Sequence, residues 1–140
     1  MQPSGQLVVI SPKLKPMAQT FCQEYELLTG RKMSVATYTK AKDGDIVLRL
    51  KKDKTLGSEG YRMAIGATCD ITAATPQALY WALQTVLQLS EQQIALPCGS
   101  TVDMPQYAIR GFMLDVARKF VPMPYIKKLA LIMAYYKMNT

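Results

Sequence analysis

Residues 61–90, YRMAIGATCDITAATPQALYWALQTVLQLS, predict a β-hairpin that leads directly into an amphipathic helix. Apolar and polar residues alternate over 61–65 and again over 69–73, and a short turn around Gly66 separates the two runs. Thr75-Pro76 is typical of a helix start, because threonine caps free amide groups and proline fits the first helical position. The helix reaches about Ser90. Its apolar face is formed by Leu79, Ala82, Leu83, Val86 and Leu87.

The sequence before this hairpin predicts three more strands and one more helix. Residues 6–10, 33–37 and 45–50 are short and rich in β-branched and apolar residues, and Ile46, Leu48 and Leu50 are predicted to form the more buried face of the third run. Gly30 is a typical C-terminal cap for the intervening helix. The apolar stripe of that helix consists of Leu14, Met17, Phe21, Tyr25 and Leu28.

The sequence after the second helix changes character near Pro105. Residues 94–96 and 101–103 predict short strands, and residues 107–115 (YAIRGFMLD) predict a strand buried on both faces. A helix follows, with Ile126, Leu129, Ala130, Met133 and Tyr136 facing inward. A buried strand followed by an amphipathic helix is the repeating unit of a parallel sheet or barrel, and one such unit cannot bury itself.

These patterns together define the predicted fold. We expect an α/β (α+β) domain with a mixed β-sheet and two helices over residues 1–106. Residues 107–140 are expected to form one βα unit of a larger parallel sheet or barrel, and this apolar segment is expected to pack on its own domain or on a second copy of the chain.

Composition excludes several classes of protein. The chain has 140 residues, 49% of them hydrophobic, which suits a globular domain rather than a disordered one. No run approaches the ~18 apolar residues of a membrane helix. The net charge is +7, but the lysines are scattered without interleaved aromatic residues, so no nucleic-acid or membrane partner is predicted. No signal peptide is recognisable, and the compartment, including export of a parent protein, is left open.

The cysteines and aromatic residues indicate no separate site. Cys22, Cys69 and Cys98 are far apart and the chain has no histidine, so we expect no metal and no cofactor. Cys22 and Cys69 are predicted to be buried, and the disulfide status of all three is left open. Tyr80 and Trp81 are predicted to be packing residues rather than a sugar-stacking platform.

Three segments resemble glycoside hydrolase family 20, the β-N-acetylhexosaminidases. Glu59-Gly60-Tyr61-Arg62-Met63 with Ile71-Thr72-Ala73-Ala74 is similar to a hairpin of the family, and residues 79–89 (LYWALQTVLQL) are similar to its following helix. Residues 103–105 and 110–120 (RGFMLDVARKF) resemble the start of its catalytic barrel, and residues 137–140 (KMNT) the end of its first barrel helix. The resemblance spans almost the whole chain, and it implies that residues 107–140 are the first βα unit of a truncated (β/α)8 barrel.

The resemblance implies hydrolysis of terminal β-linked N-acetylhexosamine by substrate-assisted, retaining catalysis. In this scheme a glutamic acid protonates the leaving oxygen, the substrate's acetamido carbonyl attacks the anomeric carbon, and an adjacent aspartate orients that group. None of the ten acidic residues forms an Asp-Glu dipeptide. The chain alone is therefore expected to be inactive, with no catalytic residue before Thr140.

Three residues are candidates for the remaining part of the site. The resemblance implies that Arg110 binds two ring hydroxyls of the terminal sugar, because a guanidinium can donate to two neighbouring oxygens. The alternative is an arginine paired at the domain junction, and Arg110 lies early in a strand whereas barrel sites lie at strand C-terminal ends. Asp115 and Arg118 are either supporting residues of the site or a structural pair. The family usually has serine and histidine at the positions of Ala117 and Lys119.

Two rival interpretations remain. Other hexosaminidase and glucuronidase families also carry a leading α/β domain before a barrel, but they differ at the barrel entry, where Leu114-Asp115 and Arg118 favour family 20. The chain could instead be a non-catalytic α/β interaction or carbohydrate-binding module. The apolar character of residues 107–140 argues against that reading.

Overall fold

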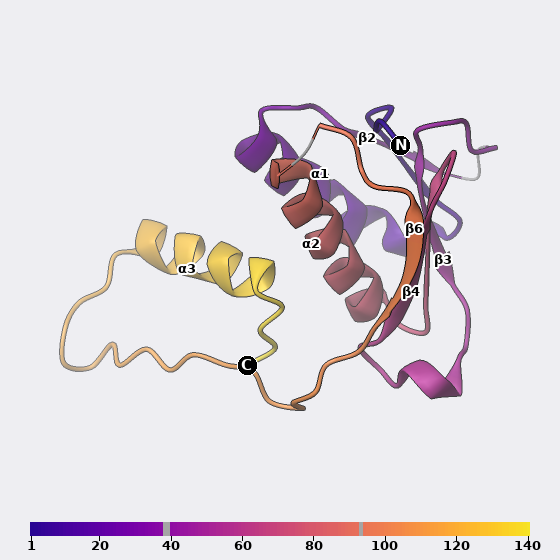
Figure 1. Ribbon diagram of the computed structural model, residues 1–140. Coiled ribbons are helices and arrows are strands. Elements are labelled where there is room, and N and C mark those ends of the chain that lie inside the picture. The colour runs from indigo at the N-terminus through magenta and orange to yellow at the C-terminus, as the bar shows by residue number, and fades with distance from the viewer. Residues whose placement is uncertain (38–39, 93) are drawn as a thin grey trace. The chain divides into compact units, whose positions relative to one another are not determined.

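The computed structural model describes residues 1–37, 40–92 and 94–140 (Figure 1). The chain divides into two compact units, Met1–Pro105 and Gln106–Thr140, and each is described below by itself.

The first unit contains a six-stranded mixed sheet. Its strands are β1 (Gln6–Val9), β2 (Ser34–Thr37), β3 (Ile46–Leu50), β4 (Tyr61–Ile65), β5 (Cys69–Ala73) and β6 (Gly99–Asp103). The spatial order is β2-β1-β3-β5-β4-β6. Four adjacent strands, β2, β1, β3 and β5, run parallel to one another. Strand β4 runs antiparallel to both of its neighbours, β5 and β6. The predicted mixed sheet is confirmed.

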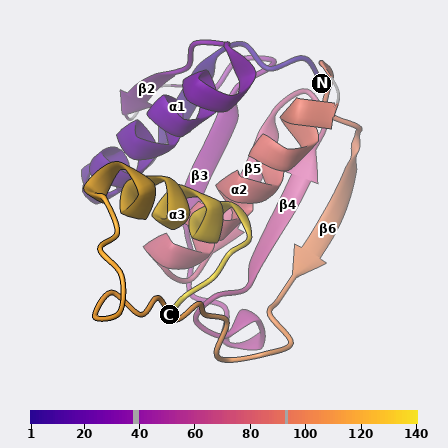
Figure 2. The same ribbon diagram turned by 90° about the vertical axis from the view of Figure 1, so that its left-hand side faces the viewer.

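Two helices, α1 (Lys15–Thr29) and α2 (Pro76–Gln92), lie side by side on one face of this sheet, as Figures 1 and 2 show. Short 3-10 helices, η1 (Pro12–Leu14) and η2 (Lys54–Leu56), precede α1 and β4. The core lies between the helices and the sheet. Its largest fully buried side chains are Tyr25, Tyr61, Phe21, Leu7, Leu14, Ile46, Leu48, Ile71, Leu79, Leu83, Leu87 and Leu96.

The predicted turn and cap signals of the first unit are confirmed. Gly30 ends α1 with a left-handed φ of 69°, and its N–H donates to the carbonyl of Glu26. Thr75 caps α2, since its hydroxyl accepts from the N–H of Ala78 at 3.1 Å. The hairpin pairs Tyr61 with Ala73 and Ile65 with Cys69.

Three details of the first unit differ from the sequence prediction. Leu28 is 49% exposed, and no residue of α1 after Tyr25 is buried. Val47 is buried while Leu50 is 41% exposed, so both faces of β3 are covered over its first three residues and its last two residues are exposed. Residues 94–96 form no strand: Leu96 is instead buried, and its N–H donates to the carbonyl of Met1.

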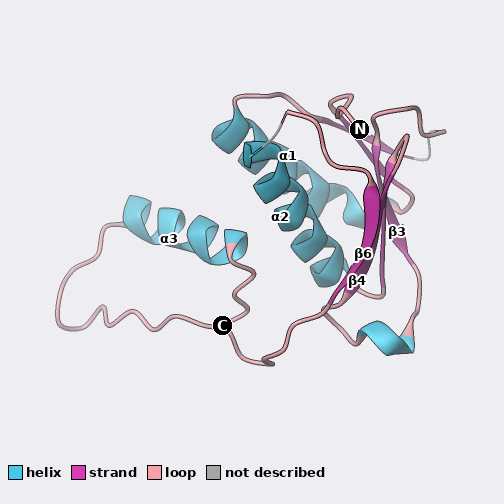
Figure 3. Ribbon diagram, viewed as in Figure 1, coloured by secondary structure: helices cyan, strands magenta, loops and turns pink. Residues whose placement is uncertain are grey.

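The second unit contains one helix, α3 (Met123–Tyr135), after a long loop that Figure 3 shows between β6 and α3. The helix is confirmed, but residues 107–115 do not form the predicted strand. A strand requires hydrogen-bonded neighbours along its length, and the second unit offers this segment a partner only at residues 139–140. Many of its large apolar residues are exposed: Tyr107, Ile109, Phe112, Met113, Val116, Phe120, Met123, Tyr125, Leu131, Ile132 and Tyr136.

The predicted inward face of α3 is only partly correct. Ile126, Leu129 and Met133 are half-buried, whereas Ala130 and Tyr136 are exposed. Within this unit, α3 has only the loop to pack against, so none of its residues becomes fully buried. Across the described residues of both units, no helix combines the length and apolar character that a membrane crossing needs.

Candidate functional site

Arg110 lies in the loop before α3 and is tied to the residues that follow this helix. Its backbone N–H donates to Asn139 Oδ1 at 3.0 Å, and its carbonyl accepts from the N–H of Asn139 at 2.8 Å. The side-chain amide of Asn139 also donates to the carbonyl of Ala108 at 2.9 Å. One asparagine therefore joins the two ends of the second unit. Asn139 lies within residues 137–140, whose resemblance to the end of the first barrel helix was the signal in the sequence, although no site role was predicted for it.

The same residues form the beginning of a parallel strand pair. The N–H of Thr140 donates to the carbonyl of Arg110, and the N–H of Phe112 donates to the carbonyl of Thr140, each at 3.2 Å. Two bonds that flank one residue, here Gly111, are the repeating pattern of a parallel ladder. A Cβ at Gly111 would lie 2.7 Å from the carbonyl oxygen of Thr140, so glycine permits this approach.

The guanidinium of Arg110 is held by main-chain carbonyls. Its Nε donates to the carbonyl of Lys137 at 2.9 Å, and its Nη1 donates to the carbonyl of Tyr107 at 2.8 Å. Lys137 has a φ of 56°, a left-handed conformation uncommon outside glycine, and this turn follows the end of α3. The side chain of Arg110 thus connects the loop before α3 with the turn after it.

Asp115 and Arg118 form a separate local pair. Asp115 Oδ1 accepts from the backbone N–H of Ala117 at 2.9 Å and of Arg118 at 3.4 Å. Asp115 Oδ2 forms an ion pair with Arg118 Nε at 3.2 Å. The contacts of Arg118 among the described residues go to Asp115 alone, and its side chain is 90% exposed. Arg118 is therefore the more accessible of the two candidate arginines.

The aromatic residues of α2 are packing residues, as predicted for Trp81. Trp81 is buried and its Nε1 donates to Glu59 Oε2 at 2.7 Å. The hydroxyl of Tyr80 donates to the buried Glu24 at 2.6 Å. Burial, followed by this hydrogen bond, raises the pKa of Tyr80 well above its ordinary value. The two rings also contact each other, with centroids 5.6 Å apart, which agrees with the predicted packing role of both residues.

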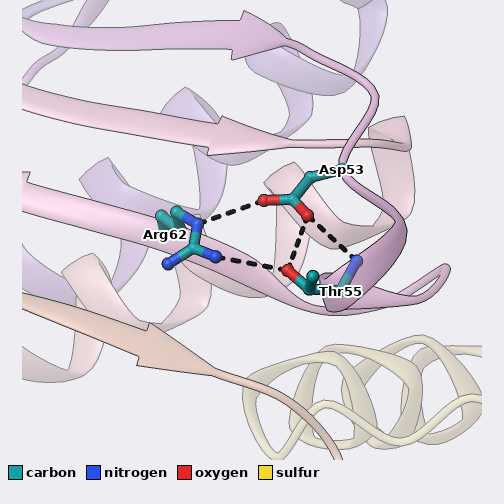
Figure 4. A network of polar contacts seen from close by, with 3 residues as sticks. All are labelled: Asp53, Thr55 and Arg62. Atoms are coloured by element: carbon teal, nitrogen blue, oxygen red, sulfur yellow. Dashed lines mark hydrogen bonds and ion pairs between the residues drawn. The ribbon is translucent and has the colours of Figure 1, made fainter.

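A second polar network lies at the exposed end of β4 (Figure 4). Asp53 accepts from the backbone and the hydroxyl of Thr55 at 2.9 and 2.6 Å, and Arg62 Nε lies 3.2 Å from its other oxygen. Hydrogen bonding from Thr55, together with the charge of Arg62, lowers the pKa of Asp53. This network caps η2 and anchors the loop between β3 and β4, which is a structural role.

The cysteines of the described chain are all free. Cys22 and Cys69 are buried, as predicted, and Cys98 is exposed. Burial raises the pKa of the Cys69 thiol to about 12 and that of Cys22 to about 11, so both thiols are unreactive near neutral pH.

Family profiles and individual similar proteins both indicate the same family for this chain. The profile described as glycosyl hydrolase family 20, domain 2, matches residues 3–109, and that of the family 20 catalytic domain matches residues 107–140. A β-N-acetylhexosaminidase of Cellulomonas fimi is 35% identical over 118 residues, which cover 80% of this chain and 24% of the relative. The chain thus spans about a quarter of that relative's length.

Solved structures show the same similarity in three dimensions. A mutant Streptomyces plicatus β-hexosaminidase in complex with the product GlcNAc is similar with a TM-score of 0.83 and 28% identity, over 100% of this chain and 30% of that one. The family 20 β-N-acetylhexosaminidase of Streptomyces coelicolor A3(2) gives a TM-score of 0.82 and 27% identity, with the same coverage. By the family profile that matches most of its length, the chain belongs to glycosyl hydrolase family 20.

Proposed function

We propose that this chain is part of a β-N-acetylhexosaminidase that removes terminal β-linked N-acetylhexosamine from oligosaccharides. The proposal is supported by matches to two successive family 20 domains and by the hexosaminidases among the similar proteins. Family 20 enzymes use the substrate's own acetamido group instead of a carboxylate nucleophile. The acetamido carbonyl oxygen bonds to the anomeric carbon as the protonated leaving group departs, and water then opens this intermediate with retention of configuration.

The catalytic pair of that scheme has no counterpart here, because residues 1–140 contain no Asp-Glu dipeptide. We expect this polypeptide alone to give no turnover of an aryl β-N-acetylglucosaminide above background. The full-length gene product that contains it should hydrolyse the same substrate. If the full-length product were folded but inactive, and bound N-acetylglucosamine oligosaccharides without cleaving them, the binding-module alternative would replace the proposed function.

Arg110 is the proposed sugar-binding residue, because residues 110–120 resemble the barrel entry of the family. A guanidinium can donate to two neighbouring ring hydroxyls at once. In the 140-residue chain its Nε and Nη1 donate to the carbonyls of Lys137 and Tyr107, and its backbone N–H donates to Asn139 Oδ1. Asp115 and Arg118, which form an ion pair at 3.2 Å, are proposed as a supporting pair of the site.

Substitution of each arginine in the full-length enzyme tests this assignment. R110A should lower kcat/KM at least 100-fold on an aryl N-acetylglucosaminide, because a charged donor to a substrate hydroxyl is lost. R118A should lower kcat/KM much less. Analogues that lack the 3- or 4-hydroxyl provide the decisive readout: the wild-type enzyme should discriminate against them, and R110A should have lost most of that discrimination. If R118A loses the discrimination and R110A keeps it, Arg118 is the sugar ligand instead.

A further inference from the structure

We propose that the edge strand β2 and the helix α1 form a docking groove for an acidic, extended peptide segment of another protein. The peptide adds to the sheet as a further strand beside β2, with alternate side chains lying in the groove. This docking groove belongs to the first unit and does not depend on the hydrolytic activity of the full-length protein.

The backbone of β2 offers the hydrogen-bonding groups that strand addition needs. Among the described residues, β2 is an end strand of the sheet and lies beside α1 (Figure 2). The N–H of Ser34 donates to the carbonyl of Gly5 at 2.8 Å, so the backbone groups of Ser34 point toward β1. Successive residues of a strand direct these groups to opposite sides, and those of Val35 therefore point to the open edge. The strand contains no charged residue and no proline, either of which would protect an exposed edge.

A groove of about 560 Å³ lies between this edge and α1. Its lining consists of Lys15, Gln19, Cys22, Gln23, Met33 and Val35. The apolar part of the lining is formed by the buried Cys22 and the half-buried Met33 and Val35. Every second side chain of an added strand points to the same face of the sheet. The groove therefore favours a peptide with small apolar residues at alternate positions.

The charge around the groove favours an acidic occupant. Lys15 lines the groove at the N-terminal end of α1, and Lys32 directly precedes β2 with its side chain 87% exposed. Because β1 and β2 are parallel, α1 runs back between them, and the two lysines lie toward opposite ends of the groove. Glu26, which contacts Lys32 at 3.9 Å, is not part of the lining. Pairing of β2 with the same strand of a second copy would bring like charges together, which disfavours that occupant.

The test uses the full-length protein and a fluorescein-labelled octapeptide of three valine–threonine pairs with a glutamate at each end. Fluorescence anisotropy should show saturable binding, and a peptide with lysine at both ends should bind at least about tenfold more weakly. Strand addition uses the N–H groups of alternate peptide residues only. N-methylation of one alternate set should therefore abolish binding, whereas N-methylation of the other set should change the affinity less than about threefold.

Two pairs of variants test the backbone edge and the charge separately. Val35→Pro removes the outward N–H and should lower the affinity at least about tenfold, whereas the control Val35→Thr keeps this N–H and should change it less than about threefold. Lys15→Glu should also lower the affinity at least about tenfold, and a carboxylate is favourable in the first turn of a helix. Its control is Lys54→Glu, at an exposed lysine of η2, which should bind normally. All four variants should keep the thermal midpoint of the wild-type protein, since proline is tolerated on edge strands.

Loss of binding in V35P and K15E, with unchanged thermal midpoints, supports the docking groove whether or not the protein hydrolyses N-acetylglucosaminides. Absence of saturable binding, equal binding of the two peptides, or equal effects of the two N-methylated sets would overturn it. A full-length dimer that V35P converts to a monomer would also overturn it, because a second copy would then occupy the edge.

Discussion

The buried carboxylate of Glu24 connects α1 to α2, and its removal should be costly. Glu24 Oε1 accepts from the hydroxyl of Tyr80 at 2.6 Å, and Glu24 Oε2 accepts from Gln84 Nε2 at 2.9 Å. Glu24 is only 7% exposed. Hydrogen bonds to a charged group contribute about 1.5–3 kcal/mol each. The variant Glu24→Ala breaks both and leaves two buried donors without their acceptor, although it also removes the cost of burying a charge.

We therefore expect E24A to lower the free energy of unfolding by about 3 kcal/mol. With a urea m-value of about 1.5 kcal/mol/M, the midpoint should fall by about 2 M. The single tryptophan, Trp81, is buried in α2 and its fluorescence reports the transition in the 140-residue chain.

The matched control is Glu26→Ala on the same helix. Glu26 is about half exposed and contacts Lys32 at 3.9 Å, a surface pair that contributes about 0–1 kcal/mol. E26A should therefore shift the midpoint little. If E24A and E26A destabilise the chain equally, the carboxylate does not connect the helices as described.

Three further predictions concern pH, a glycine and association. Burial, then the neighbouring charge of Asp70, raises the pKa of Cys69 from 9.0 to about 12, so between these pH values the unfolded chain loses a proton that the folded chain keeps. Over this range the free energy of unfolding should fall by up to about 1.4 kcal/mol for each unit of rising pH because of this group. In urea titrations at increasing pH, the free energy of unfolding of C69A should decrease less steeply than that of the wild-type chain. Gly60→Ala should lower the free energy of unfolding by more than about 1 kcal/mol, because the new Cβ would overlap the carbonyl of Leu56. Gly66→Ala is the control, since a Cβ there would meet open space and should not destabilise the chain. Equal urea midpoints for the two variants would refute this explanation. The 140-residue chain should self-associate through the exposed apolar residues of 106–140. Its sedimentation coefficient should therefore rise with protein concentration, whereas that of a chain of residues 1–105 should not.

Much of the first unit was readable from its local patterns. The alternation over 61–65 and 69–73, the Thr75 cap and the Gly30 stop each reflect short-range chemistry, and the structure places strands and helices there. The burial of individual residues was harder to predict from the sequence. Val47 and Leu50 show why, because the position of β3 at the centre of the sheet decides which side chains are covered, and strand order does not appear in the pattern of one strand.

The sequence alone determined the family, the mixed α/β class and the absence of an Asp-Glu pair, since motifs, periodicity and composition are local properties of the chain. Only the tertiary structure showed how the contacts of the two arginines differ. Arg110 and Arg118 are eight positions apart and chemically identical, but Arg110 is held by residues that follow α3, from Lys137 onward, whereas Arg118 contacts Asp115. Which partners a side chain meets depends on contacts between distant parts of the chain, and these form only when the backbone folds back after α3.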